Sequence, residues 1–565
     1  MKSNKQKINN ENNKGKNKSI KKVIIILLWI IIAFFALLKI NDFIILDKNK
    51  KINLVINNKN VTSNLKYNIL IENNEPYLSK QDLKNFFDKY IYEDDNYNKI
   101  ITTYDTKVAA ISLDEKEMKV NGSSKKMSLS IIKKDNTIYI PLEELKDIYG
   151  IEFDYIEKTK VLVIDSITRE QKKAIVSNTT SVKSSTKFIS KTIDRIKKGD
   201  YIIVISENKG YTKIRTKNGK IGYIKSKKVA NIVTVRENIE EEKQIEGKVN
   251  LAWDYYSIYA SAPDRSDESM EGVNVVSPAF FYLNDDGVLK ENIGNDGINY
   301  INWAHDNGYK VWPMVQNSEA KDINVTSGIM NDYKKREKLI EDIVNYCIKY
   351  KLDGINMDFE NMKQEDKDMY SRFIIELVPR LKEIGMVVSV DVTAPDGSET
   401  WSLCFDRTVL GDVADYIVFM AYDEYGNSSN KAGTTAGYDW VELGLNKFLG
   451  QENVDSDKII LAIPLYTRIW VEDGNGKVIS KNAVSIKNLS IPDNVQKNWD
   501  DKLKQYYVEY KDGSYTKKIW VEDEKSLEEK ISLITKNKLA GVASWEIGME
   551  KDGFWEFLNN KLNNQ

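Results

Sequence analysis

The C-terminal part of the chain alternates between short strand-like segments and longer helical patterns, and this order restricts the possible folds more than any other feature. Helical patterns such as DYKKREKLIEDIVNYCIKYK lie between most of the strand-like segments. The predicted strands are residues 248–256, 273–283, 310–317, 353–360, 386–395, 414–422, 458–470 and 539–548. Strands that alternate with helices are typical of a parallel sheet in an α/β protein.

Eight such strands with intervening helices predict an α/β fold, a (β/α)8 TIM barrel, for residues 246–565. Active sites in this fold lie at the C-terminal ends of the strands. Residues 471–521 are too many for one loop and contain strand patterns of their own, so we expect a small insertion after strand seven.

The fourth predicted strand contains DGINMDFE, residues 353–360, in which polar and apolar side chains alternate. Because side chains on a strand alternate between its two faces, one face is apolar and can pack against the outer helices. The other face points into the barrel and carries Asn356, Asp358 and Glu360. Unpaired carboxylates are costly inside a packed core, so a site at the C-terminal end of this strand is the better interpretation.

Asp358 and Glu360 lie two residues apart on one strand face, which brings their carboxyl groups close together. Repulsion raises the proton affinity of one of them, and a protonated glutamic acid can protonate a leaving oxygen. The other stays ionised and can stabilise a developing positive charge. Since both carboxyls approach the substrate from the same side, the substrate must supply its own nucleophile.

DGINMDFE resembles the signature D-G-x-D/N-x-D-x-E of family 18 glycoside hydrolases, and the resemblance extends over about residues 248–565. It implies that Glu360 is the general acid/base and that Asp358 orients the 2-acetamido group of the substrate. The carbonyl oxygen of that group attacks the anomeric carbon, and configuration is retained. Many chitinases have aspartate at the position of Asn356; its amide can still hydrogen-bond Asp358, which we expect to ionise more readily.

Other stretches match motifs of the same family. FMAYDE implies that Tyr422 donates a hydrogen bond to the acetamide, with Asp423 beside it at the rim. ASWEIG implies that Trp545 is the hydrophobic floor beneath the reacting sugar. Further candidates for substrate contact are Tyr466, Arg468, Tyr255 and Gln316. For Arg468 the alternative is a structural ion pair.

The N-terminus predicts a membrane anchor. Residues 1–22 carry eight lysines and one glutamate, and residues 23–38 are sixteen apolar residues without a break. As a helix, this apolar run spans roughly 24 Å. No small-residue cleavage motif follows it. We therefore expect a cytoplasmic tail, a retained single-pass helix at residues 23–40 and a catalytic domain outside the cell membrane.

Two accessory modules are predicted between the anchor and the barrel. Residues 51–165 contain an internal repeat, EPYLSKQDLKNFF and TIYIPLEELKDIY, and resemble the N-terminal domain of copper amine oxidases, which implies an α+β module without copper. Residues 166–185, rich in Ser, Thr and Lys, are predicted to be a linker. GYTKIRTKNGKIGYI, within residues 186–232, resembles the bacterial Src-homology-3-like all-β barrel, which implies wall binding or a rigid spacer.

The composition excludes several classes of function. With 83 basic and 84 acidic residues the formal charge is −1, so no overall positive field would gather nucleic acid. A single histidine, His305, and two cysteines, Cys347 and Cys404, exclude a two-histidine or four-thiolate metal site. We expect His305 on a helix surface and both thiols buried and unpaired. Catalysis should then use carboxylates, tyrosines or amides, with no metal and no cofactor.

The sequence leaves three hypotheses for the glycan. PLYTRIW and SWEIGMEKDGFW resemble the spore-cortex and cell-wall branch of family 18, which implies an endo-β-N-acetylglucosaminidase, expected as a monomer, that cuts peptidoglycan. The alternatives are a chitinase or chitooligosaccharide hydrolase, and a non-catalytic, lectin-like wall-binding protein. Lectin-like members usually lose the acid glutamate, and Glu360 is present.

Overall fold

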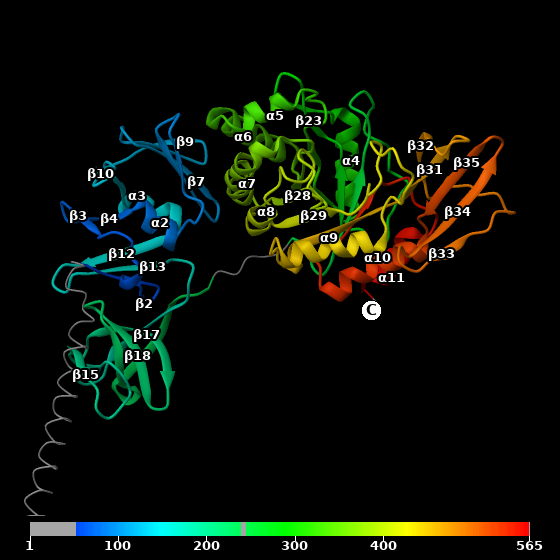
Figure 1. Cartoon of the computed structure of the whole chain (residues 1–565). Coiled ribbons are helices and arrows are strands. Elements are labelled where there is room, and N and C mark those ends of the chain that lie inside the picture. The colour runs from blue at the N-terminus through cyan, green and yellow to red at the C-terminus, as the bar shows by residue number, and fades with distance from the viewer. Residues whose placement is uncertain (1–51, 239–243, 564–565) are drawn as a thin grey trace, which may run out of the picture. The chain divides into compact units, whose positions relative to one another are not determined.

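The computed structural model describes residues 52–238 and 244–563 (Figure 1). These residues form two compact units, one of residues 52–82, 133–143 and 150–238 and the other of the remaining described residues. The predicted tail and the anchor at residues 23–40 lie outside the described residues. Among the residues that are described, no helix is long and apolar enough to cross a membrane.

The second unit contains the predicted barrel, an eleven-stranded sheet that closes where β36 pairs in parallel with β21. Two barrel strands are interrupted, so that β22 and β23 form one of them and β25 and β26 form another. The short strand β24 (Leu289–Glu291) pairs with β23 as a hairpin and is not part of the barrel wall. The eleven strands of the sheet therefore make eight parallel barrel strands. Both interruptions contain or follow a proline, Pro278 or Pro313, which cannot donate to the ladder. In chain order the strands are β21 (Val249–Asp254), β22 (Val275–Pro278) with β23 (Phe281–Leu283), β25 (Lys310–Val311) with β26 (Met314–Gln316), β27 (Gly354–Asp358), β28 (Val387–Thr393), β29 (Tyr416–Met420), β30 (Ile459–Pro464) and β36 (Gly541–Trp545).

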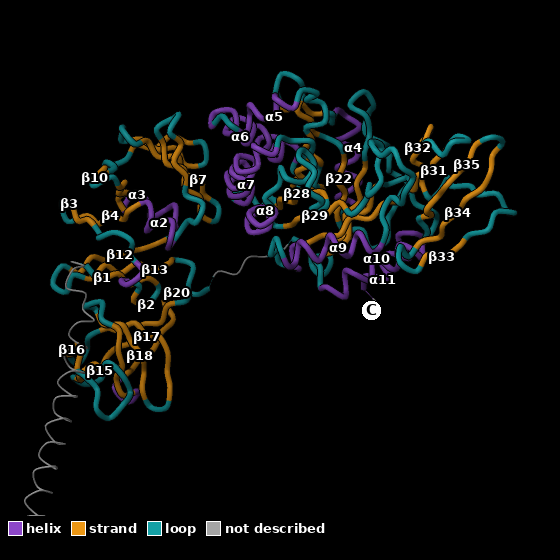
Figure 2. Tube along the Cα trace, in the orientation of Figure 1, coloured by secondary structure: helices purple, strands orange, loops and turns teal. Residues whose placement is uncertain are grey.

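Helices surround this barrel, as the purple tubes around the orange strands show (Figure 2). They are α4 (Gly294–Asp306), α5 (Ile323–Met330), α6 (Tyr333–Tyr350), α7 (Lys367–Lys382), α8 (Arg407–Val413), α9 (Tyr438–Gly450), α10 (Glu524–Asn537) and α11 (Phe554–Asn563). Several begin at an aspartate cap: Asp332 accepts from the backbone of Lys335 before α6, and Asp523 forms a capping box with Ser526 before α10.

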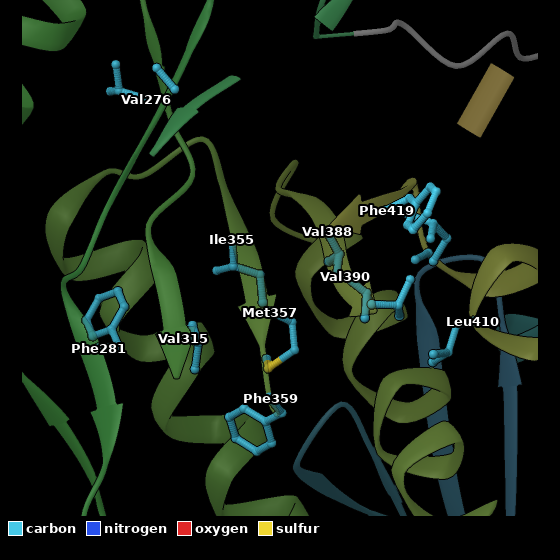
Figure 3. Packing of buried hydrophobic residues seen from close by; sticks show 14 of the residues in the cluster. Val276, Phe281, Val315, Ile355, Met357, Phe359, Val388, Val390, Leu410 and Phe419 are labelled. Carbon is cyan, nitrogen blue, oxygen red and sulfur yellow. The ribbon is translucent and has the colours of Figure 1, made fainter. Parts of the chain in front are cut away.

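The barrel has two cores, which follow from the two-residue period of its strands. Outward-facing side chains pack against the helices, and Figure 3 shows Ile355 and Met357 on β27, and Phe359 just after it, beside Val388 and Val390 on β28. Inward-facing side chains fill the interior, among them Leu251, Trp253, Trp312, Met314, Val418 and Ile460. The apolar face predicted for the fourth strand is confirmed.

The predicted insertion is present, but it starts earlier than expected. Predicted strand seven, residues 458–470, breaks at Leu465, where the backbone N–H bonds to the carbonyl of Trp545. The chain then leaves the barrel and enters a separate five-stranded sheet. Its strands are β31 (Tyr466–Glu472), β32 (Val478–Ser485), β33 (Asn498–Asp500), β34 (Gln505–Asp512) and β35 (Tyr515–Val521).

The sequence repeat of the N-terminal module appears as paired strands. β4 (Glu75–Ser79) and β11 (Thr137–Pro141) pair antiparallel, with Tyr77 opposite Pro141 and Tyr139 opposite Ser79. The short helices α2 (Lys80–Phe86) and α3 (Leu142–Tyr149) follow them. The other strands of this module are β1 (Asn53–Ile56), β2 (Lys59–Asn60), β3 (Leu70–Glu72), β5 (Tyr92–Asp94), β6 (Lys99–Tyr104), β7 (Lys107–Ser112), β8 (Glu117–Val120), β9 (Ser123–Lys126), β10 (Ile132–Lys134), β12 (Ile151–Ile156) and β13 (Val161–Ser166).

The linker predicted at residues 166–185 is wrong. This segment contains β14 and β15, both part of a seven-stranded sheet, so the all-β module starts before the predicted boundary at residue 186. Ala174, Val176 and Val182 are buried in its core, while the solvent-facing Ser, Thr and Lys residues gave the segment its linker-like composition. The sheet consists of β14 (Gln171–Val176), β15 (Thr180–Lys183), β16 (Thr192–Ile196), β17 (Tyr201–Asn208), β18 (Tyr211–Thr216), β19 (Ile221–Lys225) and β20 (Val229–Arg236).

Candidate active site

Asp358 and Glu360 line an open groove at the C-terminal end of β27. The groove has a volume of about 280 Å³, and its wall includes Asn317, Thr326 and Trp401. Asn317 fixes the backbone of Glu360 in both directions: its Oδ1 accepts from the Glu360 N–H at 2.9 Å, and its Nδ2 donates to the Glu360 carbonyl at 2.8 Å. The two carboxyl side chains therefore face a space that a ligand can enter.

Asn356 precedes Asp358 by two residues on the same face of β27 and is fully buried. Both the oxygen and the nitrogen of its side-chain amide are hydrogen-bonded. Its Oδ1 accepts from Trp253 Nε1 at 2.8 Å, and its Nδ2 donates to Ser389 Oγ at 2.9 Å and to Asp391 Oδ1 at 2.6 Å. The bond expected between Asn356 and Asp358 is not among these contacts. The amide instead connects β21, β27 and β28.

The carboxyl groups of this site hold their protons more strongly than exposed carboxyls do. Burial raises the pKa of Asp358 to about 7. Burial, with the nearby charges of Asp358 and Asp423, raises the pKa of Glu360 well above its ordinary value. A protonated Glu360 beside an Asp358 that ionises near neutral pH gives one proton donor and one anion at the same strand end.

Aromatic side chains form a cluster at the C-terminal ends of β21, β29 and β36. Trp545 lies 5.6 Å from Trp253, 6.4 Å from Tyr422 and 6.0 Å from Tyr255, measured between ring centroids. Tyr255 is about half exposed, and burial raises the pKa of Tyr422 well above its ordinary value, so Tyr422 remains a neutral donor. Such flat apolar faces suit stacking against a sugar ring.

Tyr466 and Arg468, two predicted substrate contacts, both bind Asp423. The Tyr466 hydroxyl donates to Asp423 Oδ1 at 2.7 Å, and Arg468 Nη2 donates to the same oxygen at 2.8 Å. Arg468 also reaches Asn427 Oδ1 at 3.2 Å. The alternative of a structural ion pair for Arg468 is therefore observed, and its role is to hold Asp423 at the rim.

Gln316 is buried on β26 directly opposite Asp358 in the strand register, where its Oε1 accepts from Ser318. It lies beside the site, and its contact with substrate stays a prediction. Asp353, the first residue of the DGINMDFE motif, does not lie beside the site. It binds Lys310 at 3.0 Å and His305 at 2.8 Å at the opposite end of β27, and His305 lies on α4 as expected.

Four residues of this region were missed by the sequence analysis: Trp253, Asn317, Asp391 and Trp401. Asp391 carries a signal that could have been found, because VVSVDVT on β28 places a carboxylate on the inward face of a barrel strand. Asn317 and Trp401 lie in loops after strands, where no periodic pattern identifies them.

Within the described residues, no group of three or more histidine, cysteine, aspartate or glutamate side chains is arranged to hold a metal ion. Cys347 and Cys404 are both buried and unpaired, as expected.

Two carboxyls at the end of the fourth strand of a (β/α)8 barrel, with Tyr422 of the aromatic cluster near them, are the features of a glycosidase site. The chain belongs to the glycosyl hydrolases family 18, whose model matches residues 252–550. The copper amine oxidase N-terminal domain matches residues 41–164.

Relatives of this chain include bacterial glycosylases. It is 27% identical over 295 residues to the uncharacterized glycosylase YvbX of Bacillus subtilis, covering 51% of this chain and 84% of the relative. It is 24% identical over 246 residues to the cortical fragment-lytic enzyme of the same organism, covering 42% and 56%. The spore cortex-lytic enzyme SleL of Bacillus megaterium matches with a TM-score of 0.46 and 21% identity, covering 60% of this chain and 79% of that structure.

Proposed function

We propose that this protein is a retaining endo-β-N-acetylglucosaminidase that hydrolyses β-1,4 bonds after N-acetylglucosamine in peptidoglycan. We further propose that residues 23–40 anchor it in the cell membrane with the catalytic barrel outside. The reaction is substrate-assisted, with the substrate's 2-acetamido group as the nucleophile. The observation that carries the proposal is the placement of Asp358 and Glu360 on one face of β27, lining one groove.

The other carboxyls near the groove are poorly suited to act as nucleophiles. Asp423 accepts hydrogen bonds from Tyr466 and Arg468, which hold it at the rim. Asp391 is only 1% exposed and lies behind Asn356. We therefore propose the acetamide carbonyl of the bound sugar, and neither of these two carboxyls, as the nucleophile.

Each step can be assigned to a side chain. Glu360 protonates the glycosidic oxygen as the acetamide oxygen attacks the anomeric carbon, and an oxazolinium ion forms. The Asp358 carboxylate stabilises the positive charge that develops on the acetamide nitrogen. Tyr422 orients the acetamide, and Trp545 supports the sugar from below. Glu360, now ionised, deprotonates the water that opens the ring, so configuration is retained.

The choice of peptidoglycan is supported by relatives whose names include a cortical fragment-lytic enzyme and a putative sporulation-specific glycosylase. An extracellular barrel beside a membrane would also meet peptidoglycan first. The alternative substrate is chitin or a chitooligosaccharide, because a di-N-acetylchitobiase and chitinase A1 are also among the relatives.

The test is a product analysis with the purified full-length chain. Peptidoglycan and chitin oligomers are digested in parallel, and the new reducing ends are reduced with borohydride and identified. We expect reduced N-acetylglucosamine from peptidoglycan with wild type and none with Glu360→Gln. Reduced muramic acid ends would contradict the proposal, and turnover of chitin alone would establish the alternative substrate. If wild type and Glu360→Gln behave alike while both bind cell walls, the lectin-like hypothesis replaces it.

A further inference from the structure

A third carboxyl group lies directly beside Asp358, on the neighbouring strand. In the parallel register of β27 and β28, Asn356 is opposite Ser389 and Met357 is opposite Val390, so Asp358 and Asp391 occupy the next position along. Both side chains belong to the inward face, because Val388, Val390 and Val392 fill the outward one. Asp391 is 1% exposed, so it does not touch solvent or substrate.

The hydrogen bonds around Asn356 hold Asp391 in this place. Asn356 Nδ2 donates to Asp391 Oδ1 at 2.6 Å, while its Oδ1 is occupied by Trp253 Nε1. An asparagine in this orientation offers Asp358 no donor. Asp358 Oδ1 is buried and has no hydrogen-bond partner among the described residues. A buried acceptor without a partner is costly unless an adjacent group supplies a proton.

We propose that Asp391 is a positioning residue that shares a proton with Asp358 across the two strands. This inference rests on the proposed function of the groove. In the free protein, Asp358, Asp391 and Glu360 hold two protons among three carboxyls. When the acetamide arrives, the shared proton stays on Asp391, and Asp358 becomes the anion that faces the developing positive charge. Glu360 keeps the proton that it gives to the leaving oxygen.

The surroundings of Asp391 favour this distribution of protons. The titratable groups that face it are Asp358 and Glu360 at the end of β27, Tyr370 on α7 and Tyr422 after β29. None of the ion pairs in the described part of the chain neutralises Asp358, Glu360 or Asp391 with a lysine or arginine. Burial, together with the charge of Asp358, raises the pKa of Asp391 well above its ordinary value. Three buried carboxyls without a cation cannot all ionise near neutral pH.

The experiment exchanges the two polar groups. Asp391→Asn removes the proton-sharing carboxyl. The double variant Asn356→Asp with Asp391→Asn places a carboxyl at position 356 instead of position 391. Without the proton that Asp391 shares, the Asp358 anion is less stable, so the pKa of Asp358 rises further. We therefore expect the acidic limb of the kcat/KM profile to move to higher pH by about one unit in Asp391→Asn. The double variant restores the limb. Ser389→Ala, which removes the other acceptor of Asn356 but no carboxyl, leaves the limb in place.

A second readout does not depend on turnover. Above about pH 6, exposed carboxyls are ionised, so the infrared band of protonated carboxyls reports the buried ones. We expect this band to lose intensity in Asp391→Asn and to regain it in the double variant. An Asp391→Asn variant with an unchanged band, or with a uniformly lower rate and an unshifted limb, overturns the proposal. If wild type has no glycosidase activity, the proposed function fails, and the infrared result still decides the shared proton.

The seven-stranded sheet of the other unit carries a high positive charge. Residues 171–236 contain 17 lysines and arginines but three aspartates and glutamates, a formal charge of +14 in a chain whose total is −1. Many of these cations surround one open groove of about 530 Å³. Five of them line it together with Tyr211, Tyr223 and Phe188, namely Lys183, Lys187, Arg195, Lys225 and Lys228.

The cations of this groove have no carboxylate partner within the part of the chain that the structure describes. Lys183 donates to the Thr192 hydroxyl at 2.9 Å, and no ion pair of the described residues includes any of the five. No carboxylate lines the groove. We propose that it binds a linear polymer of phosphodiester-linked polyols in the cell wall. Lysine and arginine are good phosphate ligands, and a wall polymer is the polyanion that a chain with a peptidoglycan-cleaving barrel would meet.

The test measures binding of fluorescent poly(glycerol phosphate) to the full-length chain. The triple variant Lys183→Gln, Arg195→Gln, Lys225→Gln should weaken binding at least about tenfold, because each lost cation removes a charge contact. The matched control Lys209→Gln, Lys213→Gln, Lys227→Gln removes the same charge from the same sheet outside the groove and should change binding less than about twofold. Equal weakening by both triples overturns the proposal, and so does equal or tighter binding of double-stranded DNA or polyglutamate.

Discussion

Glu360 and Asp358 acquire their chemistry from burial more than from each other. Mutual repulsion was the cause expected from their spacing, yet burial is the largest cause of the raised pKa in both, and the charge of Asp358 ranks second for Glu360. Burial at the end of the strand therefore desolvates both carboxyls and raises their pKa values. Substitutions at these residues should change both activity and the pH dependence of stability.

Glu360→Gln should lower kcat by about 10²–10⁴-fold, because the amide cannot protonate the leaving oxygen. The KM should change little, since glutamine fills the same space. In wild type, activity should fall below about pH 7 as Asp358 takes up a proton. The control Glu365→Gln alters an exposed glutamate that pairs with Lys363 at 3.7 Å and should leave kcat unchanged. A Glu360→Gln variant with near-wild-type kcat on peptidoglycan would contradict the assignment.

Asp358→Asn should make the protein more resistant to alkaline pH. The pKa of Asp358 is about 7 in the folded state, above its unfolded value of about 3.9, so folding binds a proton between these two values. The resulting stability is complete below pH 4 and is lost as pH rises to about 7. The melting temperature of Asp358→Asn should exceed that of wild type by about 2–4 °C at pH 8 and by less at pH 5. An equal difference at both pH values would disagree with this pKa.

At the scale of elements, the two-residue period of the strands explains what the sequence could predict. It placed eight barrel strands and oriented Ile355, Met357 and Phe359 outward and Asp358 inward. It could not place the break at Leu465, because the apolar pattern continues through it while the hydrogen bonds change from one sheet to another. Asp391 was not predicted, although a carboxylate on the inward face of β28 is a signal that the strand period could have identified, and loop residues such as Asn317 follow no period.

Gly354 at the start of β27 should not tolerate a side chain. A Cβ there would lie 2.5 Å from the Val387 carbonyl oxygen and 2.7 Å from Trp312 Cδ1. We expect Gly354→Ala to lower the free energy of unfolding by about 1–3 kcal/mol. Its control, Gly328→Ala, lies inside α5 with only the Lys335 amine within 4 Å, and should be neutral or stabilising. Urea unfolding of both variants tests this; equal stability would show that β27 can shift freely.

The inserted sheet is tied to α10 by a buried ion pair. Lys530 Nζ lies 2.9 Å from Glu522 Oε2, with side chains 1% and 0% exposed, and Gln505 on β34 donates to the same carboxylate. Lys530→Met leaves that charge unpaired and should cost about 3–5 kcal/mol of unfolding free energy. Adding Glu522→Leu should recover most of this loss. If Lys530→Met unfolds like wild type in urea, the pair does not stabilise the sheet.

At the scale of the whole molecule, the chain combines modules of opposite charge and different chemistry. The formal charge of the whole chain is −1, although residues 171–236 alone carry +14. Residues 166–185 have the composition of a linker but contain the strands β14 and β15. Averages over a chain this long therefore say little about any one module. The order of modules along the chain, from the apolar N-terminal segment to the barrel, carries more information.

The predicted anchor has a direct consequence for the full chain. Because sixteen apolar residues can form a helix that nearly spans a bilayer, the intact protein should partition into the membrane fraction and require detergent for release. Deleting residues 1–40 should move it to the soluble fraction with unchanged specific activity. Recovery of the full-length chain in the soluble fraction would contradict the anchor.

The claim that the substrate's own acetamide performs the attack is tested most directly by comparing two matched oligosaccharides, one N-acetylated and one with the amine free at the cleaved sugar. The account predicts hydrolysis of the acetylated oligomer alone, with the β-anomer appearing first in the proton NMR spectrum of the product. Comparable turnover of the free amine, or an α-anomer formed first, would contradict it.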